Sequence, residues 1–527
     1  NACMTKISLD IPSEVSYVTT ILQDAGYEAY FVGGCVRDLL LQRTPNDWDV
    51  TTNATPEQIQ ELFEHTFYEN DFGTVGIVND DVVSQVTTLD ETIEYNPYAY
   101  ADVSGETKLK LEKKAYLEGL KVVEVTPYRT ESAYSDNRRP DAIEFADTLA
   151  EDLERRDFTI NALAYDPVSH EITDLYSGIQ DLNAGIINTV GDADTRFQED
   201  ALRMLRAIRF SSQLGFTINK EVQDSIQNNQ ELLHKISRER VRDEFIKILN
   251  TDSPMNALLL AKDLHVLDHI SPHIARGIGV KQNGAHIYDV FEHNVRTMQH
   301  GADKEWPMVI RLSGLFHDIS KPETRRYSKE KDDYTFYGHE VVGARVTKKV
   351  LEDLKFPTKT VEKVTTLVRW HMFFSDPDQI TLSAVRRIIR NVGPDNVWDL
   401  IRLRICDRIG MGRPKEKSYR LRKYVSMMDE AMRSPISVKD LKLNGDEMME
   451  LFELKPSKKI GYILKALMNI TLETPENNNK EYLIEKTKEY LALPETELIA
   501  LAESGEEAID AAEKEEVRKI RRKHKVQ

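Results

Sequence analysis

The chain has 527 residues, of which 30% are charged and 40% hydrophobic, a composition that is ordinary for a globular protein with several domains. Its formal net charge of −18 argues against a globally basic nucleic-acid-binding protein, so any such binding must come from local patches. The three cysteines, Cys3, Cys35 and Cys406, are too far apart for a disulfide framework or a CxxC metal site. No apolar run approaches the roughly 20 residues of a membrane span and no secretory leader is visible, so we expect a cytoplasmic protein without a membrane partner.

An amphipathic helix is expected over residues 13–25, and the segment after it carries the densest pattern in the chain. The apolar residues 30–32 predict a strand, and Gly33 and Gly34 predict a tight turn. A short apolar-periodic helix follows, and the segment closes on Asp47 and Asp49 at the start of a second strand. A further helix over residues 55–67 begins with a threonine cap and a proline in its first turn.

The diglycine turn and the two aspartates together suggest phosphate chemistry. Glycines let the backbone approach a phosphate closely, and the helix that begins there points free N–H groups at it. In a strand, residues i and i+2 face the same side, so Asp47 and Asp49 would present two carboxylates together. A divalent metal would neutralise them, and phosphoryl transfer needs one. Taken singly, GG is just a turn and DxD a solvated strand end; their spacing favours the functional interpretation.

GGxxRD followed by DxD resembles the head of the DNA-polymerase-beta-like nucleotidyltransferase superfamily. It resembles more closely the class II branch, which contains CCA-adding tRNA nucleotidyltransferases and bacterial poly(A) polymerases. The resemblance implies that Asp47 and Asp49 hold two Mg²⁺ ions. It also implies that Gly33, Gly34 and Arg37 handle a nucleoside triphosphate.

Beyond this segment, a strand pair is predicted near residues 76–78 and 82–87. Residues 89–119 form a polar excursion that we interpret as a hairpin or loop insertion of unknown role. The alternating residues 121–129 predict a strand that returns to the sheet. Its Glu124 is either an exposed strand residue or a third carboxylate beside Asp47 and Asp49; the family resemblance favours the second.

Two motifs follow. Residues 129–145 are polar and basic and predict a mobile loop, which resembles the flexible loop of the family and favours CCA or A addition. In the block RRDFTINALA, Asp157 could cap the next turn. Arg155 or Arg156 could bind a triphosphate, because a planar guanidinium binds phosphate oxygens two at a time. The block as a whole matches the second motif of the family.

The EDALR sequence lies near the start of a predicted helix in which Arg203, Arg206 and Arg209 recur every three residues. One interpretation is an amphipathic helix with an ion pair between Asp200 and Arg203. The other is base recognition: an acid accepts from an exocyclic amine, and an arginine donates to ring acceptors. C and A carry that amine, whereas U and G carry a carbonyl. EDALR resembles the EDxxR motif of the family, which implies that Asp200 and Arg203 select the base, with Arg206 and Arg209 orienting them or contacting phosphate. A capped helix over residues 236–249 is given no catalytic role.

A second constellation lies in the helical region after residue 251. LFHDxxKP and GHExxGA, in that order, resemble the HD phosphohydrolase superfamily, whose histidine and carboxylate ligands hold one or two divalent metals. The candidate ligands of a second metal site are His293, His317, Asp318, His339, His371 and Asp407. A complete set suggests hydrolysis of a phosphoester; the alternative is an HD fold kept as a scaffold.

The C-terminal third contains the best basic patch, residues 402–423, where nine basic residues are interleaved with tyrosines. We prefer RNA-backbone contact over a solvated helix face. Residues 441–467 predict two short helices around a turn that could place Lys455, Lys458 and Lys459 on a phosphate. The charged end, 503–527, predicts a frayed helix or disorder.

The expected fold is therefore α+β and mostly helical. It comprises a small nucleotidyltransferase head with a mixed sheet (1–165, insertion 89–119), a nucleotide-selecting helical neck (166–250), a helical HD-type domain (251–430) and a helical tRNA-binding tail (431–527). The expected reaction adds CMP, CMP and AMP to the 3′ end of tRNA from CTP and ATP, with Mg²⁺. The rivals are a poly(A) polymerase or A-adding enzyme, and an HD phosphohydrolase whose head only binds nucleotide.

Overall fold

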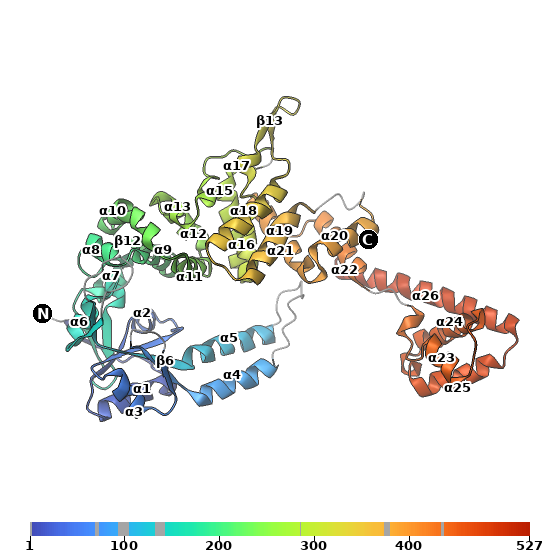
Figure 1. Cartoon of the computed structure of the whole chain (residues 1–527), viewed down its shortest axis with the longest axis horizontal. Coiled ribbons are helices and arrows are strands. Elements are labelled where there is room, and N and C mark those ends of the chain that lie inside the picture. Colours follow the sequence, from blue (N-terminus) through green and yellow to red (C-terminus); the bar gives the residue numbers. More distant parts are fainter. Residues whose placement is uncertain are drawn as a thin grey trace. The chain divides into compact units, whose positions relative to one another are not determined.

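The computed structural model describes residues 3–68, 73–92, 105–131, 143–284, 286–373, 380–433 and 437–526. The chain divides into two compact units, each of which is described by itself. Unit 1 comprises Asn1–His371 and Trp398–Pro414, and unit 2 comprises Met372–Val397 and Lys415–Gln527. Figure 1 shows the chain as a cartoon and labels many of its helices and some of its strands.

Unit 1 begins with a mixed eight-stranded sheet, as expected for the head. Its strand order is β1-β10-β9-β2-β3-β6-β5-β4. Only the β3–β6 pair is parallel among these strands as the structure describes them. The strands are β1 (Cys3–Lys6), β2 (Ala29–Val32), β3 (Trp48–Thr52), β4 (Thr66–Tyr68), β5 (Val75–Val78), β6 (Val122–Pro127), β9 (Leu163–Asp166) and β10 (Glu171–Asp174). A separate two-stranded pair joins β7 (Arg129–Glu131) to β8 (Ile143–Phe145).

The head helices bury one apolar face each against this sheet. Thr55 and Gln58 form a reciprocal capping box, and Pro56 between them is the first residue of α3. This confirms the predicted helix start. In the core, Phe31 of β2 meets Trp48 of β3 edge-on. The helices are α1 (Ser13–Asp24), α2 (Gly34–Leu40), α3 (Pro56–Leu62), α4 (Asp80–Thr92), α5 (Gly105–Leu120), α6 (Leu149–Glu154) and the 3₁₀ turn η1 (Thr159–Asn161).

Two predictions for the middle of the head are wrong. Residues 82–87 form part of helix α4 rather than a strand, and the described parts of 89–119 belong to helices α4 and α5 rather than to a hairpin or loop. Val82, Val86 and Leu89 recur at helical spacing, and their burial against the head core is what selects the helix. Helices α4 and α5 pack side by side (Figure 1). Residues 93–104 and the centre of the predicted mobile loop, 132–142, lie outside the described residues.

The rest of unit 1 is mostly helical, and much of it packs around a hydrophobic core whose buried residues run from Phe158 to Val368. After the head come α7 (Gly178–Ala184), β11 (Ile186–Ile187), α8 (Ala193–Glu199), α9 (Leu202–Leu214), β12 (Thr217–Ile218), α10 (Lys220–Asn229), η2 (Gln230–Lys235) and α11 (Arg238–Leu249). They are followed by α12 (Pro254–Asp263), α13 (Leu267–Ile270), α14 (Pro272–Ala275), α15 (Val290–Asp303), α16 (Met308–Phe316), α17 (Lys321–Thr324), β13 (Arg326–Ser328), β14 (Asp333–Thr335), α18 (His339–Asp353), α19 (Thr358–Trp370), η3 (His371–Phe373) and α21 (Val397–Gly410). The predicted domain boundaries at 165, 250 and 430 stay predictions.

Unit 2 is all helical in its described residues. Its elements are α20 (Leu382–Val392), η4 (Pro394–Asn396), α22 (Tyr419–Met432), η5 (Val438–Asp440), α23 (Gly445–Leu451), α24 (Lys458–Glu473), η6 (Pro475–Asn477), α25 (Lys480–Leu491) and α26 (Glu495–Lys523). The two predicted helices around the lysine turn are α23 and α24. Of the two alternatives predicted for the charged end, disorder is wrong for the residues described, because residues 503–523 form the last part of helix α26 and Gly505 is buried.

The expected fold class, a mixed-sheet head followed by helical regions, is confirmed. Among the described residues, no helix combines the length and the apolar character that crossing a bilayer requires.

Candidate active site and buried histidine cluster

The predicted diglycine turn joins β2 to α2 and brings charged groups against its backbone. Gly33 has a φ of 76°, which a side chain rarely adopts, and it precedes the first turn of α2. A Cβ atom added to Gly33 would lie 3.3 Å from Asp49 Oδ2 and 3.2 Å from Arg156 Nη1. One added to Gly34 would lie 3.7 Å from Asp47 Oδ1. The turn is therefore lined by both predicted aspartates and by two predicted arginines, Arg156 and Arg37.

Two of the three predicted carboxylates, Asp49 and Glu124, belong to adjacent strands, and Asp47 lies just before the first of these strands. Asp49 lies in β3 and is the register partner of Glu124 in the parallel strand β6, so both side chains leave the same face of the sheet. Asp47 is exposed and precedes β3 by one residue. The described residues contain three groups whose possible ligand atoms all lie within 4.8 Å of one another. Asp47, Asp49 and Glu124 do not form such a group, so their carboxylate oxygens lie farther apart. An all-oxygen donor set on one face nevertheless suits a hard divalent cation.

The arginines of the RRD motif are fixed by a buried acid that the prediction did not include. Asp152 is fully buried and binds Arg155 Nη2 at 2.7 Å and Arg156 Nη2 at 3.0 Å. It also accepts a hydrogen bond from Thr51 Oγ1 at 3.2 Å. Burial alone would raise the pKa of Asp152, but the two arginines hold it below its usual value. Both guanidinium groups are thus positioned at the cleft by an ionised carboxylate beneath them.

Asp157 organises the next layer of polar contacts. Its Oδ1 accepts from the Phe158 N–H at 2.8 Å and from Asn161 Nδ2 at 3.1 Å, and Arg206 Nη2 lies 2.6 Å from its Oδ2. Asn161 in turn accepts from Arg37 Nη1 at 2.8 Å. Burial opposes ionisation, yet Arg206 and these hydrogen bonds lower the pKa of Asp157 to about 2. Asp157 does accept an N–H at the start of the following turn, and it also connects Arg37 to Arg206.

The EDALR segment departs from the predicted helix. Asp200 has extended backbone angles and separates α8 from α9. Its carboxylate binds Arg240 Nη2 of α11 at 2.7 Å and accepts from the Leu202 N–H at 3.1 Å. Arg203 pairs with Glu199 at 2.5 Å and donates to the carbonyl of Arg155 at 3.0 Å. The break in the helix turns Asp200 towards the cleft.

Phe210 carries three guanidinium groups around one ring. The Cζ atoms of Arg37, Arg206 and Arg209 lie 5.1, 5.4 and 4.1 Å from its centroid. Arg209 is also paired with the buried Glu244 of α11. The ring therefore separates like charges that would otherwise repel one another.

All twelve predicted nucleotidyltransferase residues line one cleft of about 970 Å³ in unit 1. They are Gly33, Gly34, Arg37, Asp47, Asp49, Glu124, Arg155, Arg156, Asp200, Arg203, Arg206 and Arg209. Sequence reasoning missed Arg240 and Phe210, which line the same cleft. Arg240 lies within residues 236–249, the predicted helix that is given no catalytic role. Arg240 could have been found only by knowing that it binds Asp200, and the sequence does not reveal this contact because the two residues are far apart in the chain.

The six predicted HD residues also meet, in a second place within unit 1. His293, His317, Asp318, His339, His371 and Asp407 are all buried. Asp318 lies at the centre: its Oδ2 is 3.4 Å from His293 Nε2 and 3.3 Å from His317 Nε2. Its Oδ1 is 3.2 Å from His339 Nε2 and 3.7 Å from His371 Nε2. The cluster contains two triads of possible ligands, which are His293–His317–Asp407 and Asp318–His339–His371.

Backbone carbonyls orient the rings of this cluster. The Nδ1 atoms of His317, His339 and His371 lie 2.7–2.8 Å from the carbonyl oxygens of Gly314, Phe336 and Val368. That contact places the proton on Nδ1 and leaves Nε2 as the inward-facing ligand atom, which is the usual arrangement of metal-binding histidines. Burial opposes protonation of His317, but Asp318 and Asp407 raise its pKa to about 10. A bound cation would take the place of that proton, so the donor set fits a divalent transition metal.

Known protein families match three parts of the chain. Residues 29–116 and 100–188 match the "Poly A polymerase head domain", residues 215–278 the "Probable RNA and SrmB-binding site of polymerase A", and residues 290–423 the "HD domain". The CCA-adding enzyme of Ligilactobacillus salivarius (strain UCC118) is 30% identical over 485 residues, which cover 91% of this chain and 97% of that protein. The chain belongs to the CCA-adding enzyme family.

Other CCA-adding enzymes match over part of their length. That of Lactobacillus helveticus (strain DPC 4571) is 45% identical over 231 residues, which cover 44% of this chain and 48% of the relative. The chain thus spans about half the length of several curated relatives that it matches at higher identity. Among solved structures, the Bacillus stearothermophilus CCA-adding enzyme in complex with CTP is 25% identical, with a TM-score of 0.53 over 91% of this chain and 99% of that one.

The basic residues that were predicted to bind RNA do not form continuous exposed patches. The patch over residues 402–423 is split at residue 414 between the two units. Arg402 is buried against Asp399, and Arg404 binds the HD residue Asp407 at 2.5 Å. Of the lysines at the start of α24, Lys455 and Lys458 are exposed, whereas Lys459 donates to the carbonyl of Leu491 at 2.9 Å. Part of the predicted basic surface is therefore engaged in contacts within the protein and is not available to a nucleic acid.

Proposed function

We propose that this protein is a CCA-adding tRNA nucleotidyltransferase that adds CMP, CMP and AMP to the 3′ end of tRNA from CTP and ATP. The observation that carries the proposal is the single cleft that gathers the diglycine turn, the three predicted metal-binding carboxylates, the six predicted arginines and Asp200. Family membership supports the same conclusion.

In this proposal, Asp47 and Asp49, with Glu124 beside them, hold Mg²⁺. Oxygen donors on one face of the sheet suit that ion better than they suit a softer metal. The chemistry supplied by such ions is polarisation of the phosphoryl group and neutralisation of the developing charge. The diglycine backbone, Arg37 and the Asp152-bound pair Arg155 and Arg156 bind and orient the triphosphate, since guanidinium groups match phosphate oxygens in pairs.

Base choice falls to Asp200 and Arg203. An ionised carboxylate accepts from the exocyclic amine of C or A, and a guanidinium donates to the neighbouring ring acceptor. Arg240, which binds Asp200, orients that carboxylate. Arg206 and Arg209 act behind this pair and close to the triphosphate. The relative from B. stearothermophilus was solved in complex with CTP, which supports a pyrimidine nucleotide as one substrate.

The proposed tRNA partner requires cationic surface on an acidic chain. Helix α20 offers it: Arg386, Arg387 and Arg390 are exposed, while Val385 and Ile389 on the other face are buried. Lys455 and Lys458 add a second exposed pair in unit 2. Local clusters of this kind can bind a phosphate backbone despite the net charge.

The test is incorporation of labelled nucleotide into tRNA that lacks CCA. When CTP is the only nucleotide supplied, we expect CMP to be added. We expect AMP to be added from ATP once two C residues are in place. Addition of ATP alone to a CC-ended tRNA, with no use of CTP, would replace the proposal with an A-adding enzyme. Long A tails without C would indicate a poly(A) polymerase.

The role of the aspartate pair is tested by Asp47→Asn and Asp49→Asn. Each should lower nucleotide addition by about 1,000-fold, because charge stabilisation worth several kcal/mol is lost at about 1.36 kcal/mol per tenfold. The matched control is His317→Asn in the HD cluster, which should leave addition unchanged. Equal loss of addition in all three variants would contradict two separable sites.

A second activity, metal-dependent phosphoester hydrolysis, is supported by the two adjacent buried triads, which Asp318 connects. The six residues would hold one or two divalent metals, whose chemistry is polarisation of a phosphoester and of the attacking water. Hydrolysis of a 2′,3′-cyclic phosphate and of a phosphomonoester, measured with added Mn²⁺, tests it. Hydrolysis should vanish in His317→Asn and persist in Asp49→Asn; no hydrolysis by the wild-type protein would mean that the HD fold serves as a scaffold.

A further inference from the structure

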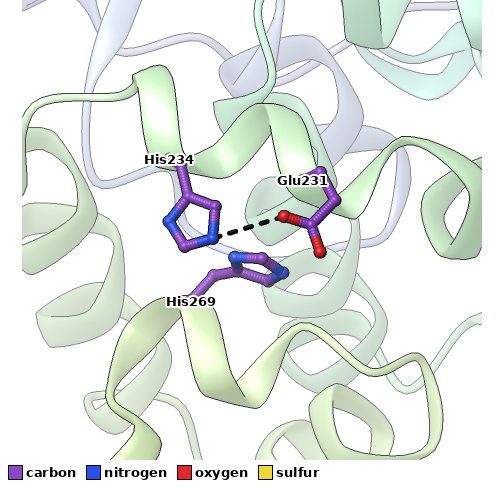
Figure 2. Close-up of side chains that lie close together, drawn as sticks. All are labelled: Glu231, His234 and His269. Carbon is purple, nitrogen blue, oxygen red and sulfur yellow. Dashed lines mark ion pairs between the residues drawn. The ribbon is translucent and has the colours of Figure 1, made fainter.

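A third group of potential metal ligands, the neck site, comprises two residues of the predicted neck and His269, which follows the neck in the chain. It shares no residue with either site described above. Glu231 and His234 belong to η2, and His269 belongs to α13 (Figure 2). In a 3₁₀ helix, side chains at i and i+3 eclipse one another, so Glu231 and His234 project from the same side. One ligand atom of each of the three residues lies within 4.8 Å of those of the other two.

The contacts within this group leave one nitrogen unaccounted for. Glu231 Oε2 lies 3.4 Å from His234 Nε2, and the rings of His234 and His269 meet edge-on with centroids 4.5 Å apart. His269 is only 8% exposed, yet its Nδ1 has no hydrogen-bond partner among the described residues. Buried polar atoms are nearly always satisfied, so an orphaned imidazole nitrogen beside a second histidine and a carboxylate indicates an absent partner.

The groups around this nitrogen favour a cation as that partner. Glu231 offers a carboxylate oxygen and His234 a second imidazole nitrogen, each within 4.8 Å of a ligand atom of His269. Carboxylate oxygens and imidazole nitrogens together are ligands of divalent transition metals. A surface ion pair between Glu231 and His234 would explain their contact, but it gives no role to the His269 nitrogen.

We propose that Glu231, His234 and His269 bind one zinc-type divalent transition-metal ion between η2 and α13. Two histidine nitrogens and one carboxylate oxygen are a common three-ligand set for zinc, with the remaining position open to water or another donor. Mg²⁺ is excluded as the preferred ion because it favours oxygen ligands. The side chains of His234 and Glu231 are 67% and 79% exposed, so an ion can enter from solvent.

The ion would cross-link two segments that are distant in sequence, η2 and α13. The backbone carbonyls of His269 and Ile270 already accept from Arg238 at 2.8 and 2.6 Å. Arg238 begins α11, the helix that carries Arg240 of the nucleotide cleft. Metal binding here therefore stabilises the support of the neck rather than taking part in nucleotide transfer.

The experiment measures zinc bound per chain after equilibrium dialysis of the full-length protein. We expect His234→Asn to bind one zinc fewer than the wild-type protein. His65→Asn is the matched control, because His65 is another exposed histidine paired with one carboxylate, Asp80, and belongs to none of the three ligand groups among the described residues. It should bind as many as the wild type. Because all the proteins keep the HD cluster, zinc bound there cancels in the comparison.

Affinity and stability give two further readouts. Glu231→Gln keeps the shape of the side chain but weakens the ligand, and should lower zinc affinity at least as much as loss of an outer-shell partner, about 10-fold to 100-fold. Zinc should raise the unfolding midpoint of the wild-type protein more than that of His234→Asn. The same zinc content and the same shift in both proteins would overturn the proposal, as would an equal loss of zinc in His65→Asn.

Discussion

Asp157 is the residue through which several charges of the cleft are held in place. It contacts Arg206 directly and Arg37 through Asn161, and both arginines also face the ring of Phe210. Its carboxylate is buried, so its ionisation depends on nearby groups, of which Arg206, Asn161 and Arg203 contribute most. Removing its charge should therefore be felt as a loss of stability that depends on pH.

The folded-state pKa of Asp157, about 2, lies below the ordinary value of 3.8. A depressed pKa contributes stability that is present above the unfolded value and lost as the pH falls through the folded value. We expect Asp157→Asn to lower the free energy of unfolding of unit 1 by about 2 kcal/mol at pH 7. The difference from wild type should hold at pH 5 and shrink as the pH falls from about 4 towards 2.

Urea unfolding of both proteins at several pH values, followed by tryptophan fluorescence, checks this expectation. Asp224→Asn is the control, because Asp224 forms an exposed ion pair with Lys220, and such pairs contribute little. A difference for Asp157→Asn that stayed constant down to pH 2 would show that packing, rather than charge, causes the loss.

At the scale of elements, unit 2 depends on the close crossing of α24 and α26. The contact centres on Gly505: a Cβ atom added there would lie less than 2.5 Å from the carbonyl oxygen of Lys465. That carbonyl is backbone and cannot yield as a side chain would. A Cβ atom added to Gly461, in α24 itself, would meet nothing within 4 Å, so Gly461 provides a helical glycine without a packing role.

The two glycines predict opposite effects of the same substitution. Alanine is favoured over glycine inside a helix by about 1 kcal/mol, so Gly461→Ala should stabilise unit 2 by up to that amount. Gly505→Ala should instead destabilise it by about 1–3 kcal/mol, the usual range for overpacking. Circular dichroism of thermal unfolding measures both. Stabilisation by Gly505→Ala would mean that α24 and α26 do not pack at that point.

At the scale of the whole molecule, the division into two units separates the optical probes. The four tryptophans, Trp48, Trp306, Trp370 and Trp398, all belong to unit 1, whereas helices occur in both units. Tryptophan fluorescence therefore follows unit 1, and far-ultraviolet circular dichroism follows both. The cleft, the HD cluster and the proposed neck site also belong to unit 1.

We expect two thermal transitions by circular dichroism, because separately compact units need not unfold as one. Added Mn²⁺ should stabilise unit 1 and so raise the midpoint temperature of the transition that fluorescence follows. The stabilisation should reach about 2.7 kcal/mol when Mn²⁺ is in hundredfold excess over its dissociation constant. The other transition should not move. A single transition shifted equally in both signals would show that the two units unfold together.

The sequence by itself determined the local signatures of this protein. The glycine turn before α2, the capped start of α3 and the alternating strand β6 were predicted because each depends on neighbours within a few residues. The twelve cleft residues and the six HD residues were also predicted, since their spacing within motifs is local and resembles that of known families. The grouping of each set in space then followed from the fold.

Only the tertiary structure decided which partner each charged group takes. Residues 82–87 are β-branched and polar enough to suit a strand, and burial of Val82 and Val86 against the head core selected a helix instead. Asp200 interrupts a helix and binds the distant Arg240, and Asp152 fixes both arginines of the RRD motif. His269 meets His234 from another helix. Such contacts join segments distant in the chain, and the free energy of burying a charge or an apolar face depends on what the fold places beside it.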